Sequence, residues 1–179
     1  MSTSFKSAIE RLKAHVRDVP DFPKKGVLFK DITPILANGQ LFRLAVTIFA
    51  ERYQRKSVEK IVAIDARGFI FGGALAHYLG IGMTIVRKKG KLPYKSHQHE
   101  YELEYGQGVL EMHIDAIEPN QRVVIIDDLL ATGGTAEAAA KLVQKCGGDI
   151  VELAFLVELE FLHGREKLKG YPVFSAITY

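Results

Sequence analysis

Two adjacent acids, Asp127 and Asp128, stand between an apolar run and a turn of small and hydroxyl-bearing residues. The apolar run, residues 123–126, is rich in β-branched side chains, which is typical of a strand buried on both faces of a parallel sheet. The turn consists of Ala131, Thr132, Gly133, Gly134 and Thr135. Small residues let backbone N–H groups crowd around an anion, and the helix that follows adds the partial positive charge of its N-terminus. The spacing therefore predicts a phosphate-binding loop with two carboxylates a few residues upstream.

The two acids indicate what else the ligand carries. Acids beside a phosphate loop would repel a bare phosphate, whereas a ribose diol or a divalent metal ion is a suitable partner for carboxylate oxygens. We therefore expect a ribose 5-phosphate, with its phosphate in the turn and its hydroxyls on Asp127 and Asp128. The chain contains neither G-x-x-x-x-G-K-[ST] nor G-x-G-x-x-G after a strand, which excludes two other phosphate motifs. The alternative is an ordinary strand and helix cap with acids that are merely solvated.

Composition limits the class of protein. A chain of 179 residues is expected to form one domain, 1–179, with a sizeable core. The net charge of +3 is too small to argue for a nucleic-acid partner, and the single cysteine, Cys146, excludes an internal disulfide. The N-terminus has no apolar signal region, and charges interrupt every candidate membrane span, so we expect a cytoplasmic protein with no membrane partner.

Strands and helices are expected to alternate along the chain. Apolar runs predict strands over residues 61–64, 83–86, 123–126, 150–157 and 174–177, the last of them at a sheet edge. Apolar residues at helical spacing predict helices over residues 5–16, 41–53 and 69–79, and a helix after the turn that ends at Gly147-Gly148. Prolines and a glycine mark residues 21–36 as an irregular connection. The expected fold is α/β, an open, mostly parallel twisted sheet of the Rossmann-like type with helices on both faces.

Polar residues follow several of these strands, at the edge where such sheets bind ligands. Residues 65–68, Arg87 and residues 127–135 all lie at expected carboxyl ends of strands. A long insertion, residues 87–113, begins there with five cations between Arg87 and Lys95. Residues 100–111 alternate as in a hairpin, with Gly106 and Gly108 at its turn. We expect this insertion to be a flexible lid over the ligand, the alternative being a solvated surface hairpin.

Taken together, these segments resemble the adenine phosphoribosyltransferases, a branch of the type I phosphoribosyltransferases, over nearly the whole chain. The matching pieces are FPKKGVLFKDITPIL, AIDARGFIFG, IVRKKGKLP, YELEYG, VVIIDDLLATGGT and VELEFLHGREKL. The resemblance implies transfer of the phosphoribosyl group of 5-phosphoribosyl 1-diphosphate (PRPP) to N9 of adenine, giving AMP and pyrophosphate. It also implies Mg²⁺, with Asp127 and Asp128 nearby, a cytoplasmic homodimer, and a small N-terminal hood at about residues 18–36.

The resemblance also implies roles for residues outside the phosphate loop. For the pyrophosphate it implies Asp65, Ala66, Arg67, Arg87 and Lys91, with a non-proline cis peptide that aims backbone N–H groups at the ligand. For the adenine it implies Val27, Leu28, Phe29, Lys30 and Leu129, with the backbone of Leu28 reading the amino edge. Glu104 would hold the N7 proton while N9 attacks, and Tyr105 would bond near the pyrophosphate. Asp127, Asp128 and Arg67 would join these two as the catalytic residues.

Two departures from the family pattern leave alternatives open. Members often carry serine where this chain has Ala66, and often arginine where it has Lys30. A lysine near the base could favour hypoxanthine or guanine, although we expect Lys30 to point toward solvent or a carboxylate such as Glu104. A PRPP-sensing regulator without turnover is the alternative from another class, but it would need an output surface, and the sequence contains no helix-turn-helix pattern or basic patch.

Overall fold

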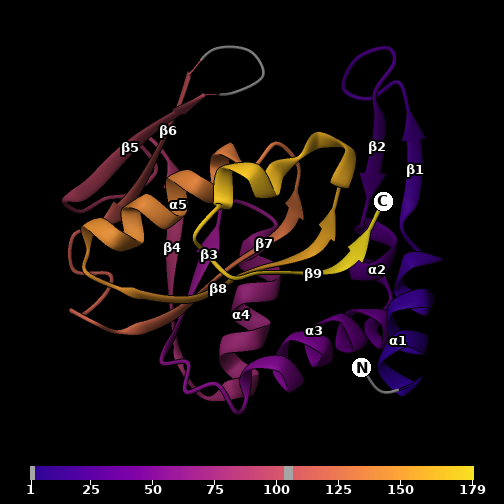
Figure 1. The fold of residues 1–179 in the computed structure, drawn as a ribbon, viewed down its shortest axis with the longest axis horizontal. Helices are drawn as coiled ribbons and strands as arrows, with labels where there is room; N and C mark the ends of the chain where they lie inside the picture. Colours follow the sequence, from indigo (N-terminus) through magenta and orange to yellow (C-terminus); the bar gives the residue numbers. More distant parts are fainter. Residues whose placement is uncertain (1–2, 103–106) are drawn as a thin grey trace. The chain divides into compact units, whose positions relative to one another are not determined.

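The computed structural model describes residues 3–102 and 107–179, and the chain forms two compact units, residues 1–49 and 50–179. The first unit contains α1 (Thr3–Lys13), β1 (Arg17–Pro20), β2 (Leu28–Asp31), α2 (Thr33–Ala37) and most of α3 (Gly39–Tyr53). Strands β1 and β2 form an antiparallel two-stranded ribbon (Figure 1). The predicted irregular connection, residues 21–36, is therefore wrong in part, because residues 28–31 pair with a strand that the sequence did not reveal.

Helix α3 confirms the predicted helix at 41–53 and begins two residues earlier. The side chain of Asn38 explains this start, since its Oδ1 accepts the backbone N–H groups of Gln40 and Leu41 at 3.0 and 3.1 Å. Such a bond satisfies donors that the first turn of a helix leaves without intrahelical partners.

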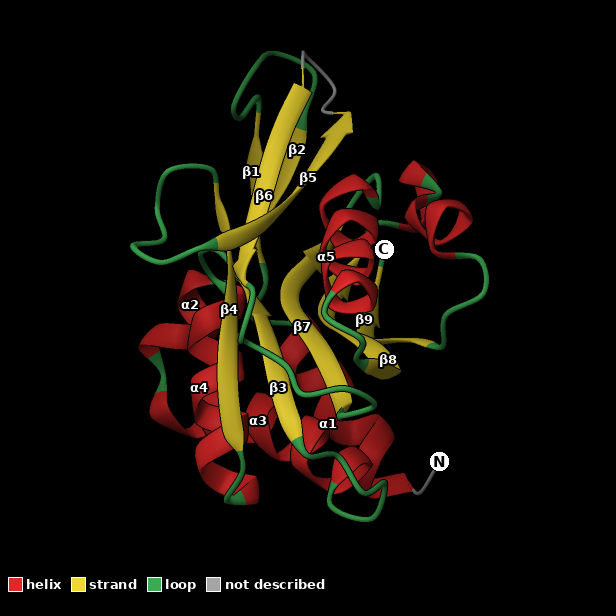
Figure 2. Cartoon of the chain, turned by 90° about the vertical axis from the view of Figure 1, so that its left-hand side faces the viewer, coloured by secondary structure: helices red, strands yellow, loops and turns green. Residues whose placement is uncertain are grey.

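The second unit is built on one seven-stranded sheet with the order β5-β6-β4-β3-β7-β8-β9 (Figure 2). Its strands are β3 (Lys60–Ile64), β4 (Gly82–Lys88), β5 (Ser96–Glu102), β6 (Gln107–His113), β7 (Arg122–Leu130), β8 (Asp149–Glu158) and β9 (Val173–Thr178). Strands β4, β3, β7, β8 and β9 are parallel, and β5 and β6 extend the sheet antiparallel. The open, mostly parallel sheet and the edge position of the last strand confirm the predicted fold.

Alternate residues of the central strands pack on opposite faces of the sheet. Val62 and Ile125 belong to a buried cluster that includes the apolar side of α5 (Gly134–Lys145). Ala63 and Ile126 point the other way, where a Cβ at Gly72 of α4 (Gly68–Leu79) would meet their side chains. Figure 1 accordingly shows α4 and α5 on the two sides of the sheet. Helices thus cover both faces and leave the strand ends open for ligands.

The strands extend beyond their predicted bounds, and two departures bear on the site. Strand β7 does not stop at Ile126 but continues through both acids, because Asp127 and Leu129 still pair with β8. In the hairpin, Gly108 lies within β6 opposite Tyr101. A Cβ at Gly108 would come within 2.6 Å of the Tyr101 ring, so this glycine makes room for a ring, and its placement at the turn was wrong. Gly106 lies outside the described residues.

Among the residues that the structure describes, none of the helices has the length and apolar character needed to cross a membrane.

Candidate active site

A cavity of about 640 Å³ opens at the carboxyl ends of β3, β4 and β7. Its lining contains the following residues that were predicted for the site: Asp65, Ala66, Arg67, Arg87, Lys91, Asp127, Asp128, Leu129 and Thr135. It also contains three that the sequence did not single out: Lys88, Tyr101 and Leu110. The alternating strands and helices therefore bring the predicted pyrophosphate and acid residues to one place, as expected from the sheet topology.

The phosphate loop forms a smaller cavity of about 90 Å³, lined by Asp127 and residues 129–136. Asp127, Leu129 and Thr135 line both cavities, so the two are contiguous. Gly133 caps α5 with φ at +83°, a left-handed conformation in which L side chains are strained. The loop therefore presents its backbone at the start of a helix, the arrangement that suits a phosphate.

Asp128 is buried beside the guanidinium of Arg67. Arg67 Nε donates to Asp128 Oδ2 at 2.5 Å, and the Asp128 residue is only 6% exposed. Arg67 caps α4, and the next residue, Gly68, lies so close to β7 that a Cβ would come within 2.8 Å of the Ile126 carbonyl oxygen. This close approach places the start of α4 against the acid pair. The preceding peptide bond, Asp65–Ala66, is cis, as the family resemblance implies.

Asp127 lies in an unfavourable environment for a negative charge. Burial raises its pKa well above the usual range, and the neighbouring Asp128 carboxylate raises it further. Two effects partly oppose this shift: the backbone N–H of Asp128 donates to Asp127 Oδ1 at 2.8 Å, and Arg67 lies nearby. Two acids held side by side in this way are stabilised by a positive charge between or beside them. The cavity can therefore hold a cation or stabilise a positive charge that develops on a bound ligand.

Hydrogen bonds fix the positions of Arg87 and Lys91, which both line the large cavity. Arg87 Nε donates to Asp65 Oδ2, and its Nη1 donates to the Lys91 carbonyl, both at 3.2 Å. The Glu111 carboxylate accepts the backbone N–H groups of Lys91 and Leu92 at 3.0 Å each. Glu111 thus fixes the loop between β4 and β5, which contains Lys91 and contacts Arg87.

Sequence reasoning missed Glu111. It is 3% exposed and lies between Leu110 and Met112, which are also buried. An acid inside an apolar strand is the signal that could have found it, because a buried carboxylate needs partners.

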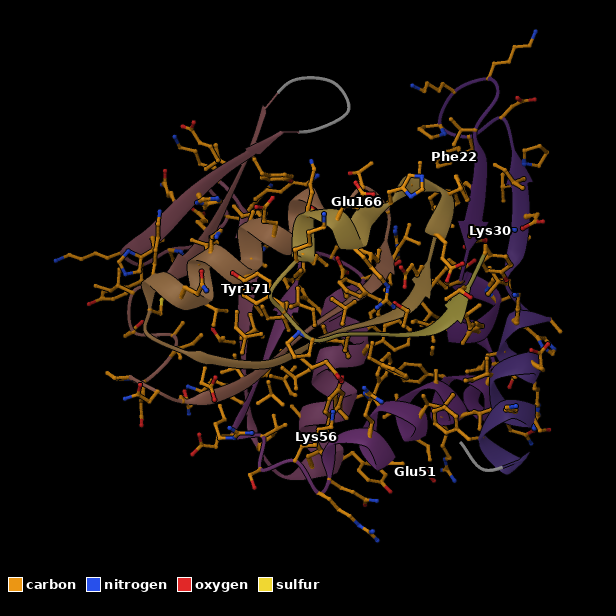
Figure 3. The ribbon with its side chains drawn as sticks, viewed as in Figure 1. Phe22, Lys30, Glu51, Lys56, Glu166 and Tyr171 are labelled. Carbon is orange, nitrogen blue, oxygen red and sulfur yellow. The ribbon has the colours of Figure 1, made fainter. Side chains whose placement is uncertain are left out.

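The remaining predicted site residues belong to other parts of the chain than the residues that line these cavities. Glu104 and Tyr105 lie outside the described residues. Val27, Leu28, Phe29 and Lys30 belong to the first unit, residues 1–49. There the Phe29 ring packs edge-to-face on Phe22, and Lys30 Nζ donates to Asp18 Oδ1 at 2.6 Å. Figure 3 labels Phe22 and Lys30 of this unit. Lys30 therefore turns to a carboxylate, as expected, although that carboxylate is Asp18.

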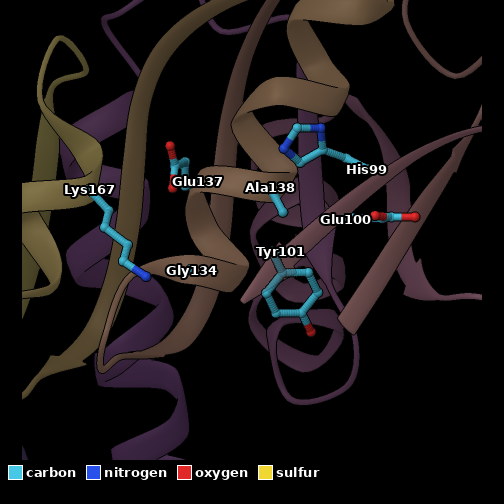
Figure 4. A pocket seen from close by; sticks show the side chains of 7 residues that line it. All are labelled: His99, Glu100, Tyr101, Gly134, Glu137, Ala138 and Lys167. Carbon is cyan, nitrogen blue, oxygen red and sulfur yellow. The ribbon is translucent and has the colours of Figure 1, made fainter. Parts of the chain in front are cut away.

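A third cavity, of about 310 Å³, lies between β5, the start of α5 and the short 3₁₀ helix η2 (Gly164–Leu168). Tyr101 lines both this cavity and the large one. Figure 4 shows Lys167 of η2 reaching toward Gly134 at the start of α5. The segment that contains η2 thus adjoins the phosphate loop.

Comparisons with known proteins identify the family. Residues 31–176 match the family model described as "Phosphoribosyl transferase domain". The adenine phosphoribosyltransferase of Methylacidiphilum infernorum is 56% identical over 179 residues, all of both chains. The crystal structure of the adenine phosphoribosyltransferase from Thermoanaerobacter pseudethanolicus is 50% identical, with a TM-score of 0.93 over 96% of this chain and 99% of that one.

A third relative carries ligands in its crystal structure. The adenine phosphoribosyltransferase of Saccharomyces cerevisiae, complexed with an imino-altritol bisphosphate and adenine, is 40% identical and has a TM-score of 0.91. The alignment covers 96% of this chain and 99% of the yeast chain. These matches extend over the phosphate loop, both acids and the predicted cations of the cavity, Arg67, Arg87 and Lys91, which together are called the cationic wall. The chain belongs to the adenine phosphoribosyltransferase family.

Proposed function

We propose that the large cavity transfers the 5-phosphoribosyl group of PRPP to N9 of adenine, giving AMP and pyrophosphate. The observation that carries this assignment is the continuity of a phosphate loop, an acid pair and a cationic wall at one sheet edge. Full-length relatives named adenine phosphoribosyltransferase favour adenine over hypoxanthine or guanine, and favour an enzyme over a regulator. The yeast relative, complexed with adenine, supports the same base.

The 5-phosphate is assigned to residues 131–135. The backbone N–H groups of this loop and of the N-terminus of α5 would donate hydrogen bonds to its oxygens, and the hydroxyls of Thr132 and Thr135 would add further donors. A phosphate fixed there directs the ribose toward Asp127 and Asp128, which line the adjoining cavity. Holding the ribose at both ends orients C1′ for attack.

The pyrophosphate is assigned to the cationic wall of Arg67, Arg87 and Lys91, together with Asp65 and Ala66. When N9 of adenine bonds to C1′, the bond from C1′ to the diphosphate oxygen breaks and the electron pair leaves with the pyrophosphate. Cations on this wall stabilise the departing charge, since preformed charges aimed at the transition state need little reorganisation. C1′ becomes positively charged, as at other glycosidic centres, and the acid pair stabilises that charge.

Mg²⁺ fits the acid pair. Asp127 and Asp128 offer oxygen ligands. Burial and, after it, the Asp128 charge raise the pKa of Asp127, and a divalent cation beside the pair would oppose both effects. Mg²⁺ in such sites takes one or two carboxylates and completes its shell with substrate phosphates and water. When bound, the metal would neutralise part of the diphosphate charge.

The base-binding and proton-handling assignments rest on the family resemblance. Leu129 lines the cavity and is proposed to cover one face of the adenine ring. Val27, Leu28, Phe29 and Lys30 are proposed for the base as well, and Glu104 and Tyr105 for the proton and the pyrophosphate. The insertion 87–113 would close as a lid that excludes water from the reacting centre.

A two-fold homodimer is the proposed assembly. Large apolar side chains on α4 and β4 support it, because Ile70, Tyr78 and Met83 are 41%, 58% and 40% exposed. Sedimentation at assay concentration should give the mass of two chains, whereas a fully active monomer would contradict the dimer.

Product analysis tests the proposed function. Incubation with PRPP, adenine and Mg²⁺ should give AMP and pyrophosphate in equal amounts, and excess chelator should abolish both. A chain that consumes PRPP without forming AMP would contradict the assignment of the base. A chain that binds PRPP without turnover would instead fit the regulator.

A further inference from the structure

The segment 157–168, VELEFLHGREKL, matched the family but received no role from the chemistry of the site. It begins at the end of β8 and forms the two short 3₁₀ helices η1 (Glu160–Leu162) and η2. The linings of the large cavity and of the phosphate loop come from other segments. The segment packs against the phosphate loop at Ala131 and Gly133.

The contact between this segment and the loop is made by backbone. Gly164 is buried, and a Cβ there would overlap the Ala131 carbonyl oxygen. From the other side, a Cβ at Gly133 would overlap the carbonyl oxygen of Gly164. The Leu159 N–H also donates to the Leu130 carbonyl at 3.0 Å. The two segments of backbone therefore pass each other so closely that the conformation of one restricts the conformation of the other.

An ion pair fixes the position of Gly164. Arg165 Nε and Nη2 each donate to a different oxygen of Glu158, both at 2.7 Å. Arg165 Nη1 also donates to the Val173 carbonyl of β9 at 3.1 Å. Glu158 is only 2% exposed, and although burial opposes ionisation, the bonds from Arg165 and Ser175 bring its pKa below the usual range. The pair is therefore charged at neutral pH and ties the residue next to Gly164 to two strands.

We propose that residues 158–168 brace the phosphate loop, with Gly164 as the point of contact and the Glu158–Arg165 pair as the anchor. A loop that binds an anion through backbone N–H groups has no long side chain to hold its shape, so a second backbone sets it. Gly164, Glu158 and Arg165 are positioning residues for the 5-phosphate, an inference that rests on the proposed function. Because the 5-phosphate is bound alike in the ground and transition states, disturbing the brace should weaken binding more than it lowers kcat.

Gly164→Ala is the direct test, with two ligands measured by calorimetry. AMP carries the 5-phosphate, whereas pyrophosphate occupies the wall formed by Arg67, Arg87 and Lys91. We expect the Kd for AMP to rise about tenfold or more, since misplacement of the order of 1 Å is costly at such sites, while the Kd for pyrophosphate stays within about twofold. The matched control is Gly82→Ala, whose Cβ would meet only the flexible Lys60 Cε at 3.6 Å.

Arg165 variants test the anchor without adding an atom beside the loop. Arg165→Met should raise the KM for PRPP and the Kd for AMP with a smaller change in kcat. Arg165→Lys, which keeps a charge but loses the two-point geometry, should recover part of the affinity. If Arg165 only stabilised the fold, its replacement would weaken the binding of AMP and of pyrophosphate to the same extent. That result would overturn the proposed brace.

The results separate this inference from the proposed function. Unchanged AMP affinity in folded Gly164→Ala, or in Arg165→Met if the alanine variant does not fold, would overturn the brace alone. If the native chain forms no AMP from adenine and PRPP, the proposed function fails, whatever the variants do.

Discussion

Two arginine–carboxylate pairs in residues 50–179 look alike at their shortest contact but differ in their surroundings. Arg67 Nε donates to Asp128 and Arg52 Nε donates to Glu152, each at 2.5 Å. Both acids are buried, with 6% of Asp128 and 4% of Glu152 exposed. The two acids differ in their other partners. Those partners indicate that the Arg52–Glu152 pair stabilises the fold and that the Arg67–Asp128 pair belongs to the candidate active site.

Glu152 has every partner that a buried carboxylate requires. Arg52 Nη2 gives it a second bond at 2.7 Å, and the Tyr53 hydroxyl donates at 2.7 Å. Lys56 Nζ lies 3.4 Å away, and the Arg52 guanidinium stacks 4.0 Å from the centre of the Phe174 ring. Burial opposes ionisation, yet these donors bring the pKa of Glu152 below its usual range. The pair fastens the last turn of α3 to β8.

Asp128 shares its surroundings with another acid. The Arg67 side chain is 44% exposed, and the pair borders the large cavity. Next to it, burial and the Asp128 charge raise the pKa of Asp127. The charge of Glu152 is compensated within the protein, whereas the charge of Asp127 is poorly compensated there, and a cationic ligand can stabilise it.

Replacing the site acids should have the largest effect. Asp127→Asn and Asp128→Asn should each lower kcat/KM by about a hundredfold or more, because electrostatic stabilisation of the reacting centre is worth several kcal/mol. Steady-state kinetics with PRPP and adenine measure this. Glu152→Gln is the matched control and should keep kcat/KM within about twofold. Near-normal turnover in both aspartate variants would contradict a catalytic role for these acids.

Replacing the structural acid should instead lower stability. Glu152→Gln leaves Arg52 and Tyr53 with a neutral partner and should destabilise the fold by about 1–3 kcal/mol at pH 7. Since the folded pKa of Glu152 is lowered, its contribution is present above the unfolded pKa, about 4.3, and is lost as the pH falls through the folded value. Urea unfolding at several pH values should show the deficit shrinking in acid. A deficit independent of pH would contradict the role of the charge.

Asp127→Asn should change stability in the opposite direction. The folded pKa of Asp127 is raised, so the native residue costs stability as the pH rises through that value. The asparagine variant should therefore be the more stable chain at pH 8, with the gain vanishing as the pH falls and the native carboxyl takes up its proton. Thermal unfolding in the absence of ligands measures this. Loss of stability at pH 8 would show that the charge of Asp127 is compensated within the protein.

A third buried acid should give the smallest effect. Glu111→Gln keeps one oxygen for the N–H groups of Lys91 and Leu92 but loses the charge, a difference of about 1 kcal/mol for such bonds. We expect the KM for PRPP to rise about three- to tenfold with little change in kcat, because the loop between β4 and β5, which carries Lys91, is held less firmly. An equal rise in the KM for PRPP of the Glu152→Gln control would show that the effect is not specific to Glu111 and follows from replacing a buried acid anywhere in the fold.

Sequence patterns predicted what is local in this molecule. The run 123–126 and the small residues that follow it predict a strand, a turn and a helix without help from distant residues. The alternation of strands and helices then places Asp65, Arg87 and Asp127 at one edge. Strand β1 was missed because its four residues have no apolar run, and it is paired only through β2.

The parts that could not be predicted depend on long-range contacts. Nothing near Gly164 in the sequence reveals that its backbone lies against Ala131. Likewise, Gly108 resembles a turn residue until the Tyr101 ring is placed beside it. The roles of Glu104, Tyr105 and the hood residues stay predictions from the resemblance, and the lid at residues 87–113 stays a prediction from the sequence pattern.

The choice of base is the most direct test of the whole account. Adenine presents an N6 donor and an N1 acceptor, and hypoxanthine reverses both, so a site built for one leaves buried polar groups unsatisfied with the other. Initial rates of nucleotide formation should be measured with PRPP, Mg²⁺ and adenine, hypoxanthine or guanine. We predict a kcat/KM for adenine roughly a thousandfold or more above those for the oxopurines. Comparable values for adenine and hypoxanthine would contradict the account, and Lys30→Arg would then be the first variant to make.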